Sequence, residues 1–206
     1  MIECIKYGEI HYYKNVIENP YELIEQIEKT DIKCTSKTGI TKWRWWKKPS
    51  ENYGKTKAIK PNIKEEPKGE LININNQIIG ALDITLRDYL TYYPNDIEKD
   101  FRYGKGGFEP LTINKYFENA YMSYHTDSQG DKNSPTVTSI IYLNDDYVGG
   151  ELGFKNPEIV IKPEAGSVIV FPSTPPYYHE SKLLIKGTKY MILQSWFKTG
   201  ILDNFN

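Results

Sequence analysis

Residues 136–150 read Thr-Val-Thr-Ser-Ile-Ile-Tyr-Leu-Asn-Asp-Asp-Tyr-Val-Gly-Gly, a run of β-branched and aromatic residues that ends in polar residues and glycines. Val, Ile, Thr and Tyr are enriched in strands, whereas Asn, Asp and Gly favour turns. This stretch predicts a strand over 136–143 and a turn at Gly149 and Gly150. Short β-type runs of the same kind occupy 111–117, 158–162, 167–171 and 188–198. Short strands separated by turn residues predict an antiparallel jelly roll, or double-stranded β-helix, in the C-terminal half.

The N-terminal half contains two helical patterns separated by a loop-rich region. Asn19 and Pro20 have the chemistry of an N-cap and a first helical position, and residues 21–27 continue with apolar side chains at helical spacing. Between Asn76 and Tyr93, apolar residues recur every three or four positions, which predicts a longer helix. Residues 43–69 begin with a strand-like run and continue as a loop rich in Lys, Pro and Gly. We expect an α+β fold in which the N-terminal helices pack on one sheet of the jelly roll.

Length and composition favour a single intracellular domain. The 206 residues fit one domain, divided into an N-terminal part over 1–110 and a jelly-roll catalytic core over 111–198. The net charge of -1 argues against nucleic acid and anionic membranes as partners. The chain has neither a long apolar run nor a signal-peptide pattern, so we expect a soluble, cytoplasmic protein. Oligomeric state cannot be read from these features.

The cysteines and histidines are few and informative. The two cysteines, Cys4 and Cys34, lack the spacing of a disulfide framework or a structural zinc site. Of the three histidines, His125 lies two residues before Asp127, and His179 lies much later. Residues i and i+2 of an extended segment share one face, so this imidazole and this carboxylate can bind one metal ion together.

Two histidines and one carboxylate on one face of a metal form the facial triad of non-haem iron(II) oxygenases, which leaves coordination positions open for other ligands. His125, Asp127 and His179 therefore predict a metal site. The alternative is a chance surface pair together with a distant core histidine.

A lysine near the distal histidine supports the metal-site hypothesis. If Lys186, Gly187 and Thr188 form a three-residue hairpin loop, Ile185 pairs with Lys189, and Lys189 shares a face with His179. An ammonium buried in an apolar barrel is costly without a counter-charge, so Lys189 there would imply an anionic ligand. The alternative is a solvated lysine that points outward.

Several ordered motifs in this half resemble one protein family. The chain reads Tyr116-Phe-Glu-Asn119-Ala-Tyr-Met122-Ser-Tyr-His125-Thr-Asp127, followed by Thr138-Ser-Ile-Ile-Tyr142-Leu-Asn144, Gly149-Gly150-Glu-Leu-Gly-Phe154, Lys162-Pro163-Glu-Ala-Gly166-Ser-Val-Ile-Val-Phe171, and His179 through Gly187-Thr-Lys189 to Trp196. From about Leu111 to Phe197, this pattern resembles the prolyl 4-hydroxylase-like branch of the 2-oxoglutarate and iron(II)-dependent dioxygenases. Departures occur at Asn119, where the family has glycine, and at Met122, where it often has an aromatic residue.

The resemblance implies specific roles for these residues. His125, Asp127 and His179 would be the iron ligands, while Lys189 and Tyr116 would bind the distal carboxylate of 2-oxoglutarate. Thr138 would either line the co-substrate pocket or only face the barrel lumen. The implied cofactors are Fe(II), 2-oxoglutarate and O2, with L-ascorbate as a further candidate. The implied reaction hydroxylates a substrate with release of succinate and CO2.

The substrate is less well specified than the chemistry. The family branch favours a prolyl residue in a peptide or protein, and loops over 47–69, 95–110 and 128–135 have the composition of mobile lids. The alternatives are a catalytically silent jelly-roll binding module and an oxygenase that acts on nucleic acid or a small molecule. Residues 43–48 mix aromatic and basic side chains that could stack on a single strand, although burial against the helices is the better interpretation. We expect His11 in an N-terminal strand, and Trp196 facing away from the pocket toward the helices.

Overall fold

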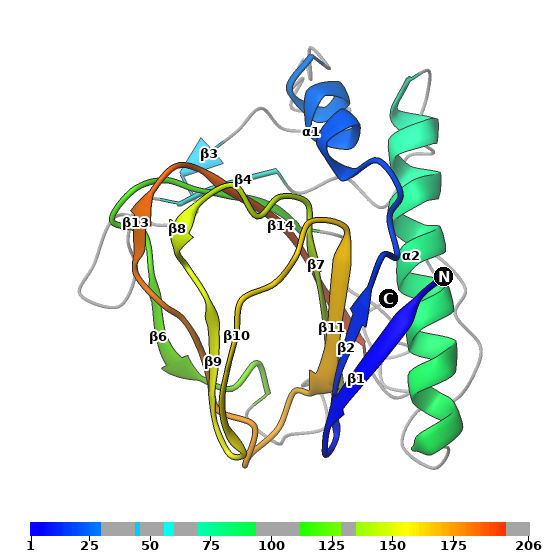
Figure 1. Ribbon diagram of the computed structural model, residues 1–206, viewed down its shortest axis with the longest axis vertical. Coiled ribbons are helices and arrows are strands. Elements are labelled where there is room, and N and C mark those ends of the chain that lie inside the picture. Colours follow the sequence, from blue (N-terminus) through cyan, green and yellow to red (C-terminus); the bar gives the residue numbers. More distant parts are fainter. Residues whose placement is uncertain (30–43, 46–55, 60–69, 94–111, 129–134, 197–206) are drawn as a thin grey trace, which may run out of the picture.

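A large antiparallel sheet forms one side of the molecule (Figure 1). The computed structural model describes residues 1–29, 44–45, 56–59, 70–93, 112–128 and 135–196. The strands of this sheet are β1 (Glu3–Tyr7), β2 (Ile10–Lys14), β3 (Arg44–Trp45), β4 (Thr56–Ile59), β5 (Thr112–Tyr116), β7 (Val137–Tyr142), β11 (Ser167–Pro172) and β14 (Lys189–Trp196). Their order is β1-β2-β11-β7-β14-β5-β4-β3, so strands from both ends of the chain lie side by side.

A smaller layer faces the large sheet and closes the barrel (Figure 1). It contains β6 (Met122–His125), β8 (Val148–Gly149), β9 (Leu152–Lys155), β10 (Glu158–Ile161), β12 (His179–Ser181) and β13 (Leu184–Lys186). Four of these form a sheet in the order β10-β9-β12-β6, and β8 pairs with β13. The two facing antiparallel layers confirm the predicted jelly roll.

Two helices flank the barrel. α1 (Pro20–Lys29) begins where predicted, and the amide of Leu23 makes the first helical hydrogen bond to the carbonyl of Asn19, at 3.2 Å. α2 (Glu70–Tyr92) begins six residues before the predicted start at Asn76. Several asparagines at this end weaken the helical signal, but the buried Ile74 continues the apolar stripe of the helix. α2 contacts β11 and β7 on the outside of the barrel (Figure 1).

The central strands of the large sheet are buried on both faces. On one face, Ile141 and Ile192 pack with the helices in the outer core. On the other face, Ile140 and Met191 pack inside the barrel with side chains of the smaller layer. Because consecutive strand residues face opposite sides, a strand buried on both faces needs a nearly continuous apolar run. This explains why 136–143 alternates so little between apolar and polar residues.

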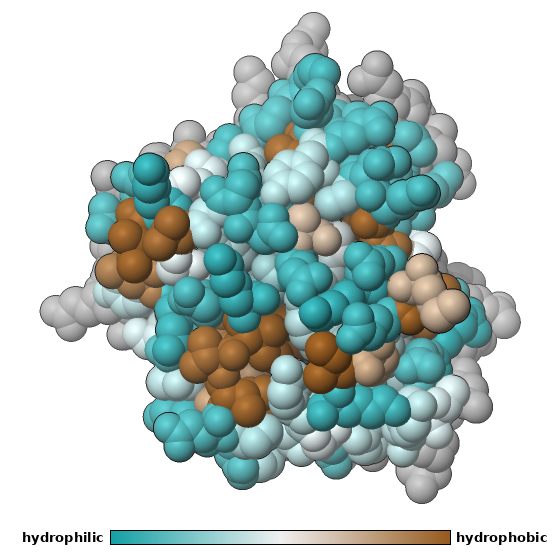
Figure 2. All heavy atoms as spheres, viewed as in Figure 1, coloured by the Kyte–Doolittle hydropathy of each residue, from teal (hydrophilic) through white to brown (hydrophobic). Residues whose placement is uncertain are grey.

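The surface of the molecule mixes hydrophilic side chains with separate apolar groups. Figure 2 shows a largely hydrophilic face with separate hydrophobic groups, one of which lies over β8 and β13. Val148, Leu183 and Ile185 are exposed in this region, whereas Leu184 is fully buried. Alternate residues here thus face the solvent and the barrel. None of the described helices is long and apolar enough to cross a membrane.

Candidate active site

Two neighbouring strands of the smaller layer bring His125, Asp127 and His179 together. β6 and β12 run antiparallel, and His179 lies directly opposite His125. Asp127 lies two residues after the end of β6. One ligand atom from each residue lies within 4.8 Å of the other two. The Nε2 atoms of His125 and His179 lie 3.4 Å and 3.7 Å from the two carboxylate oxygens of Asp127.

The backbone fixes the orientation of both imidazoles. Nδ1 of His125 is 2.8 Å from the carbonyl oxygen of Ser123, and Nδ1 of His179 is 3.3 Å from that of Tyr177. A carbonyl oxygen can only accept, so each Nδ1 carries the proton and donates. The Nε2 lone pairs of both rings then remain available beside Asp127. This second hydrogen bond is the usual arrangement of a metal-binding histidine.

The electrostatics favour the metal-binding forms of His179 and Asp127. Burial against Phe171 and Phe154 lowers the pKa of His179 to about 4, so its imidazole is neutral at neutral pH. Burial would raise the pKa of Asp127, but its hydrogen bond with His125 and the nearby His179 lower it instead. Burial likewise opposes protonation of His125, but hydrogen bonds with Asp127 and Ser123 raise its pKa. A carboxylate between two imidazole nitrogens is a donor set that a divalent metal can bind.

Thr138 lies behind the carboxylate. Its hydroxyl donates to Oδ2 of Asp127 at 2.6 Å and lies 2.8 Å from the hydroxyl of Ser173. Thr138 is fully buried and is not among the residues that line the cavity described below. The geometry therefore places Thr138 where it orients Asp127, and its contact with the co-substrate stays a prediction. Ser173 was not predicted from the sequence.

A cavity of about 250 Å³ lies between the two layers beside these residues. Both layers contribute to its wall, which consists of Asn114, Tyr116, Met122, His125, Thr126, Asp127, Ile140, Tyr142, Leu152, His179, Ser181, Lys189, Met191 and Leu193. Most of this wall is apolar. Asn114 and Ser181 are polar lining residues that we did not predict. Each lies two positions from a predicted site residue in the same strand, so strand periodicity could have identified both.

Lys189 is the most deeply buried charged group in this wall. It is 1 % exposed, and its Nζ donates to the carbonyl of Gly150 at 2.8 Å and to the hydroxyl of Ser181 at 2.6 Å. Burial lowers the pKa of the ammonium to about 7, although the negative charge of Glu151 opposes this. In the described part of the chain, no carboxylate contacts the ammonium directly. A cation without a counter-ion in such a place marks a site for an anion.

Tyr116 lies next to Lys189 across the sheet. The two residues are directly opposite in β5 and β14, and Nζ of Lys189 lies 4.6 Å from the centre of the phenol ring. Burial raises the pKa of Tyr116, so its hydroxyl stays protonated. The phenol can therefore donate a hydrogen bond to an anion beside Lys189.

The route by which Lys189 reaches the cavity differs from the prediction. β13 pairs with β8, and β14 pairs with β5 and β7, so the expected hairpin pairing of Ile185 with Lys189 is wrong. Gly187 has a φ of +93° where the chain crosses from the smaller layer to the large sheet. Lys189 and His179 thus face the cavity from opposite layers.

The departure at Asn119 has a conformational explanation. Asn119 has a φ of +68°, in the left-handed region that glycine adopts easily and that asparagine tolerates better than most other residues. Its amide donates to the carbonyl of Leu184 at 2.8 Å, which ties the loop before β6 to β13. Asparagine can therefore fill the position of the family glycine.

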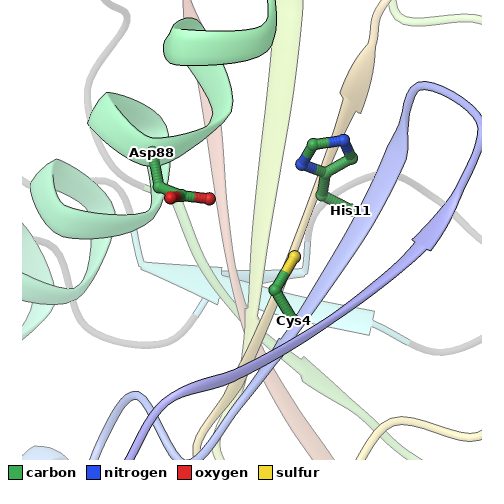
Figure 3. Close-up of side chains that lie close together, drawn as sticks. All are labelled: Cys4, His11 and Asp88. Carbon is green, nitrogen blue, oxygen red and sulfur yellow. The ribbon is translucent and has the colours of Figure 1, made fainter.

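A second group of potential metal ligands lies outside the barrel. Cys4 from β1, His11 from β2 and Asp88 from α2 point toward a common space (Figure 3). The hydroxyl of Tyr13 bridges two of them, since it lies 3.2 Å from Nδ1 of His11 and donates to Asp88 at 2.9 Å. Burial, followed by the charge of Asp88, raises the pKa of the Cys4 thiol, which keeps it protonated. These are the features of a hydrogen-bonded cluster that joins α2 to the sheet.

Other predictions can be compared with the structure only in part. His11 lies in β2, and Trp196 packs in the outer core with its indole N–H donating to the hydroxyl of Ser139, both as predicted. Most of the candidate lid segments, and all but two of the residues 43–48, lie outside the described residues.

Comparisons with known proteins show what the C-terminal half and the fold are similar to. A family model described as the 2OG-Fe(II) oxygenase superfamily matches residues 111–198. No curated protein sequence gives a significant match. The fold is similar to a viral collagen prolyl hydroxylase from Paramecium Bursaria Chlorella virus-1 in complex with 2OG, with a TM-score of 0.59 and 18 % identity over 92 % of this chain and 94 % of that chain.

Two further solved structures show the same likeness. A Trichoplax adhaerens prolyl hydroxylase in complex with a peptide fragment of the hypoxia inducible factor oxygen degradation domain has a TM-score of 0.66 and 16 % identity, over 96 % of this chain and 87 % of that chain. A Pseudomonas putida prolyl-4-hydroxylase has a TM-score of 0.57 and 16 % identity, over 90 % of this chain and 86 % of that chain. The matching domain over residues 111–198, together with this fold, supports a 2-oxoglutarate-dependent dioxygenase that uses Fe(II), 2-oxoglutarate and O2.

Proposed function

We propose that this dioxygenase hydroxylates a prolyl residue in a peptide or protein, with release of succinate and CO2. One observation carries the proposal: three metal-ligand side chains and an anion-binding lysine meet in a single cavity. The prolyl hydroxylases with a similar fold, one of them bound to a peptide, support the choice of substrate class. We also propose that the protein is a jelly roll whose N-terminal helices pack on its larger sheet.

In this proposal, His125, Asp127 and His179 hold the iron. The two histidines bind through Nε2, because each Nδ1 is engaged by a backbone carbonyl. Iron(II) held by three protein ligands keeps positions open for a 2-oxo acid and for oxygen, and it supplies the oxidative chemistry. Thr138 holds Asp127 in place through its short hydrogen bond. The fit of these residues to a metal rests on their donor set and on the imidazole orientation described above.

Lys189 and Tyr116 bind the distal carboxylate of 2-oxoglutarate in this proposal. The ammonium supplies charge, and the protonated phenol supplies a hydrogen-bond donor. Ile140, Leu152 and Met191 line the same cavity, and their apolar side chains would exclude water from it. The protein thereby fixes the orientation of the co-substrate before the reaction begins.

The prolyl substrate would approach from the side of His125. The side chain of His125 is 32 % exposed, compared with 5 % for His179. The triad is therefore open to solvent on one side and closed on the other. A peptide could reach the exposed side without disturbing the buried one.

The experiment that tests this function measures succinate release by the purified protein with Fe(II), 2-oxoglutarate, ascorbate and O2, with and without proline-rich peptides. We expect the peptides to stimulate turnover, and we expect His125→Ala and Lys189→Ala to abolish it. Thr91→Ala, which removes an exposed hydroxyl at the end of α2, is the matched control and should behave as wild type.

Mass spectrometry of the peptides would locate the added oxygen. Turnover that no peptide stimulates would contradict the prolyl assignment and direct attention to a nucleic acid or a small molecule. Iron binding without turnover under any of these conditions would instead favour a silent binding module.

A further inference from the structure

Ser181 occupies a special place in the cavity. It lies in β12, two residues after His179, and lines the cavity from the smaller layer. Its hydroxyl accepts a hydrogen bond from Nζ of Lys189, which belongs to the large sheet, at 2.6 Å. Through Ser181, strand β12, which also carries His179, contacts Lys189.

The hydrogen bonds around Lys189 leave donors available for a ligand. An ammonium has three N–H donors, and two of them are used by Ser181 and by the carbonyl of Gly150. The hydroxyl of Ser181 accepts one of these bonds, so its own proton is available to be donated. Among the described residues, no acceptor for this proton is recorded. The third ammonium hydrogen and the serine hydroxyl are therefore both available in one corner of the cavity.

We propose that Ser181 is a co-substrate-binding residue that donates a hydrogen bond to the distal carboxylate of 2-oxoglutarate beside Lys189. This inference rests on the proposed role of Lys189. The two donor atoms are 2.6 Å apart, so one carboxylate, which has two acceptor oxygens, can accept from both. Accepting a hydrogen bond from an ammonium also polarises the hydroxyl and makes it a better donor.

A purely structural role is the competing explanation. In that case, Ser181 would only tie the two layers together through Lys189. The two roles differ in which ligand they affect. A contact with the distal carboxylate matters only for ligands that have this carboxylate, whereas a distorted cavity would weaken the binding of any 2-oxo acid.

The test compares two ligands on the Fe(II)-loaded protein without oxygen, by calorimetry. The first ligand is 2-oxoglutarate, and the second is 2-oxopentanoate, which has a methyl group in place of the distal carboxyl. For Ser181→Ala we expect the dissociation constant of 2-oxoglutarate to rise about tenfold, as befits one hydrogen bond to a charged group. The dissociation constant of 2-oxopentanoate should stay within about twofold of the wild-type value. Ser181→Thr keeps the hydroxyl and should restore most of the affinity for 2-oxoglutarate.

Each other outcome overturns the inference. Unchanged binding of 2-oxoglutarate to Ser181→Ala would show that the hydroxyl does not contact the ligand. Equal weakening of both ligands, or failure of Ser181→Thr to restore binding, would indicate the structural role. Thermal unfolding and iron content would verify that each variant is folded and loaded. If the wild-type protein binds neither 2-oxo acid, the proposed function itself fails, which is a distinct result.

Discussion

At the scale of single residues, Lys189 is a group that its surroundings perturb strongly. An ammonium that is 1 % exposed and rests on two neutral acceptors is held in an unfavourable place. The folded protein keeps it there because the surrounding strands fix its position. Binding sites commonly retain such unfavourable groups, since the ligand supplies the missing charge.

This environment makes stability depend on pH. The pKa of Lys189 is about 7 in the folded protein, against an ordinary value of 10.5. Between these values the unfolded chain binds the proton and the folded protein does not, so this lysine opposes folding less as the pH rises from 7 toward 10.5. Below pH 7 the cost of the buried charge is present in full. We expect Lys189→Met to be more stable than the wild type near pH 6.5, by a margin on the order of a few kcal/mol.

That margin should shrink by pH 9.5. The measurement is urea denaturation of the ligand-free wild type and Lys189→Met at both pH values, with the difference between the two proteins as the readout. Groups other than residue 189 titrate alike in both proteins, so their effect on the free energy of unfolding cancels in this difference. A margin that is the same at both pH values would contradict the low pKa of Lys189.

Thr138 provides a second prediction at this scale. Thr138→Val removes the donor to Asp127 while keeping the shape of the side chain, so the carboxylate loses a bond that orients it. Loss of such a supporting hydrogen bond typically weakens metal affinity about 10- to 100-fold. We expect a loss in this range for Fe(II), measured by competition with a chelator. Thr138→Ser keeps the hydroxyl and should bind iron nearly as well as wild type; equal losses in both variants would point to packing instead.

The residues of the candidate site could be predicted to very different degrees. His125 and Asp127 could be predicted as a pair because an extended segment places i and i+2 on one face. In the structure the strand ends at His125, but the two side chains still meet, with Nε2 3.4 Å from the carboxylate. Ser173 could not be predicted, because it meets Thr138 only through the pairing of β11 with β7, thirty-five positions apart in the chain. Pairings of that kind depend on the register of distant strands, which composition and periodicity do not specify.

At the scale of elements, the strands were easier to predict than their partners. The predicted strand 136–143 is one residue longer than β7 at each end, and the predicted strand 167–171 ends one residue before β11 does. The wrong prediction concerns the residues around Gly187. They were expected to form a hairpin loop, but they connect β13 in the smaller layer to β14 in the large sheet. A turn residue indicates that the chain changes direction, but it does not indicate which strand comes next in the sheet.

Two glycines allow the packing of β8 against β13 to be tested. Gly149 and Gly8 both have positive φ, of +77° and +65°. A Cβ added at Gly149 would collide with the carbonyl of Leu183, whereas a Cβ at Gly8 would meet nothing within 4 Å. Both alanine variants share the conformational cost of about 1 kcal/mol, so their difference isolates the collision.

We expect Gly8→Ala to lower the free energy of unfolding by about 1 kcal/mol, and Gly149→Ala to lower it by at least about 2 kcal/mol more, since overpacking forces the backbone to move. Chemical denaturation of the two variants beside the wild type measures this. Equal losses would mean that β8 and β13 separate easily enough to accept the methyl group.

At the scale of the whole molecule, the site is divided between the two layers. His125 and His179 come from the smaller layer, and Lys189 and Tyr116 come from the large sheet. In the described residues, three side-chain hydrogen bonds cross between the layers at the site: one runs from Thr138 to Asp127, and two run from Lys189, to Ser181 and to the carbonyl of Gly150. In the proposed function, the metal ligands and the anion-binding residues thus come from different layers, and the two layers must pack together to complete the site.

The division of the site predicts how the co-substrate affects dynamics. A ligand that binds only the folded, closed barrel stabilises it by mass action. We expect saturating 2-oxoglutarate with Fe(II), without oxygen, to slow amide hydrogen exchange in β6 and β12 and in the facing β5 and β14. Exchange in α1, which is remote from the site, should stay unchanged. Protection confined to one layer would contradict binding across both.

The hydrogen bond between Ser181 and Lys189 also has a consequence for the resting enzyme. Before the co-substrate enters, this bond and the Gly150 carbonyl keep the ammonium fixed at the end of the cavity instead of letting the side chain swing through it. If Lys189 binds the distal carboxylate as proposed, the ligand meets an ammonium that is already oriented toward it. The serine thus preorganises the lysine side chain, so that ligand binding does not pay the entropic cost of ordering it.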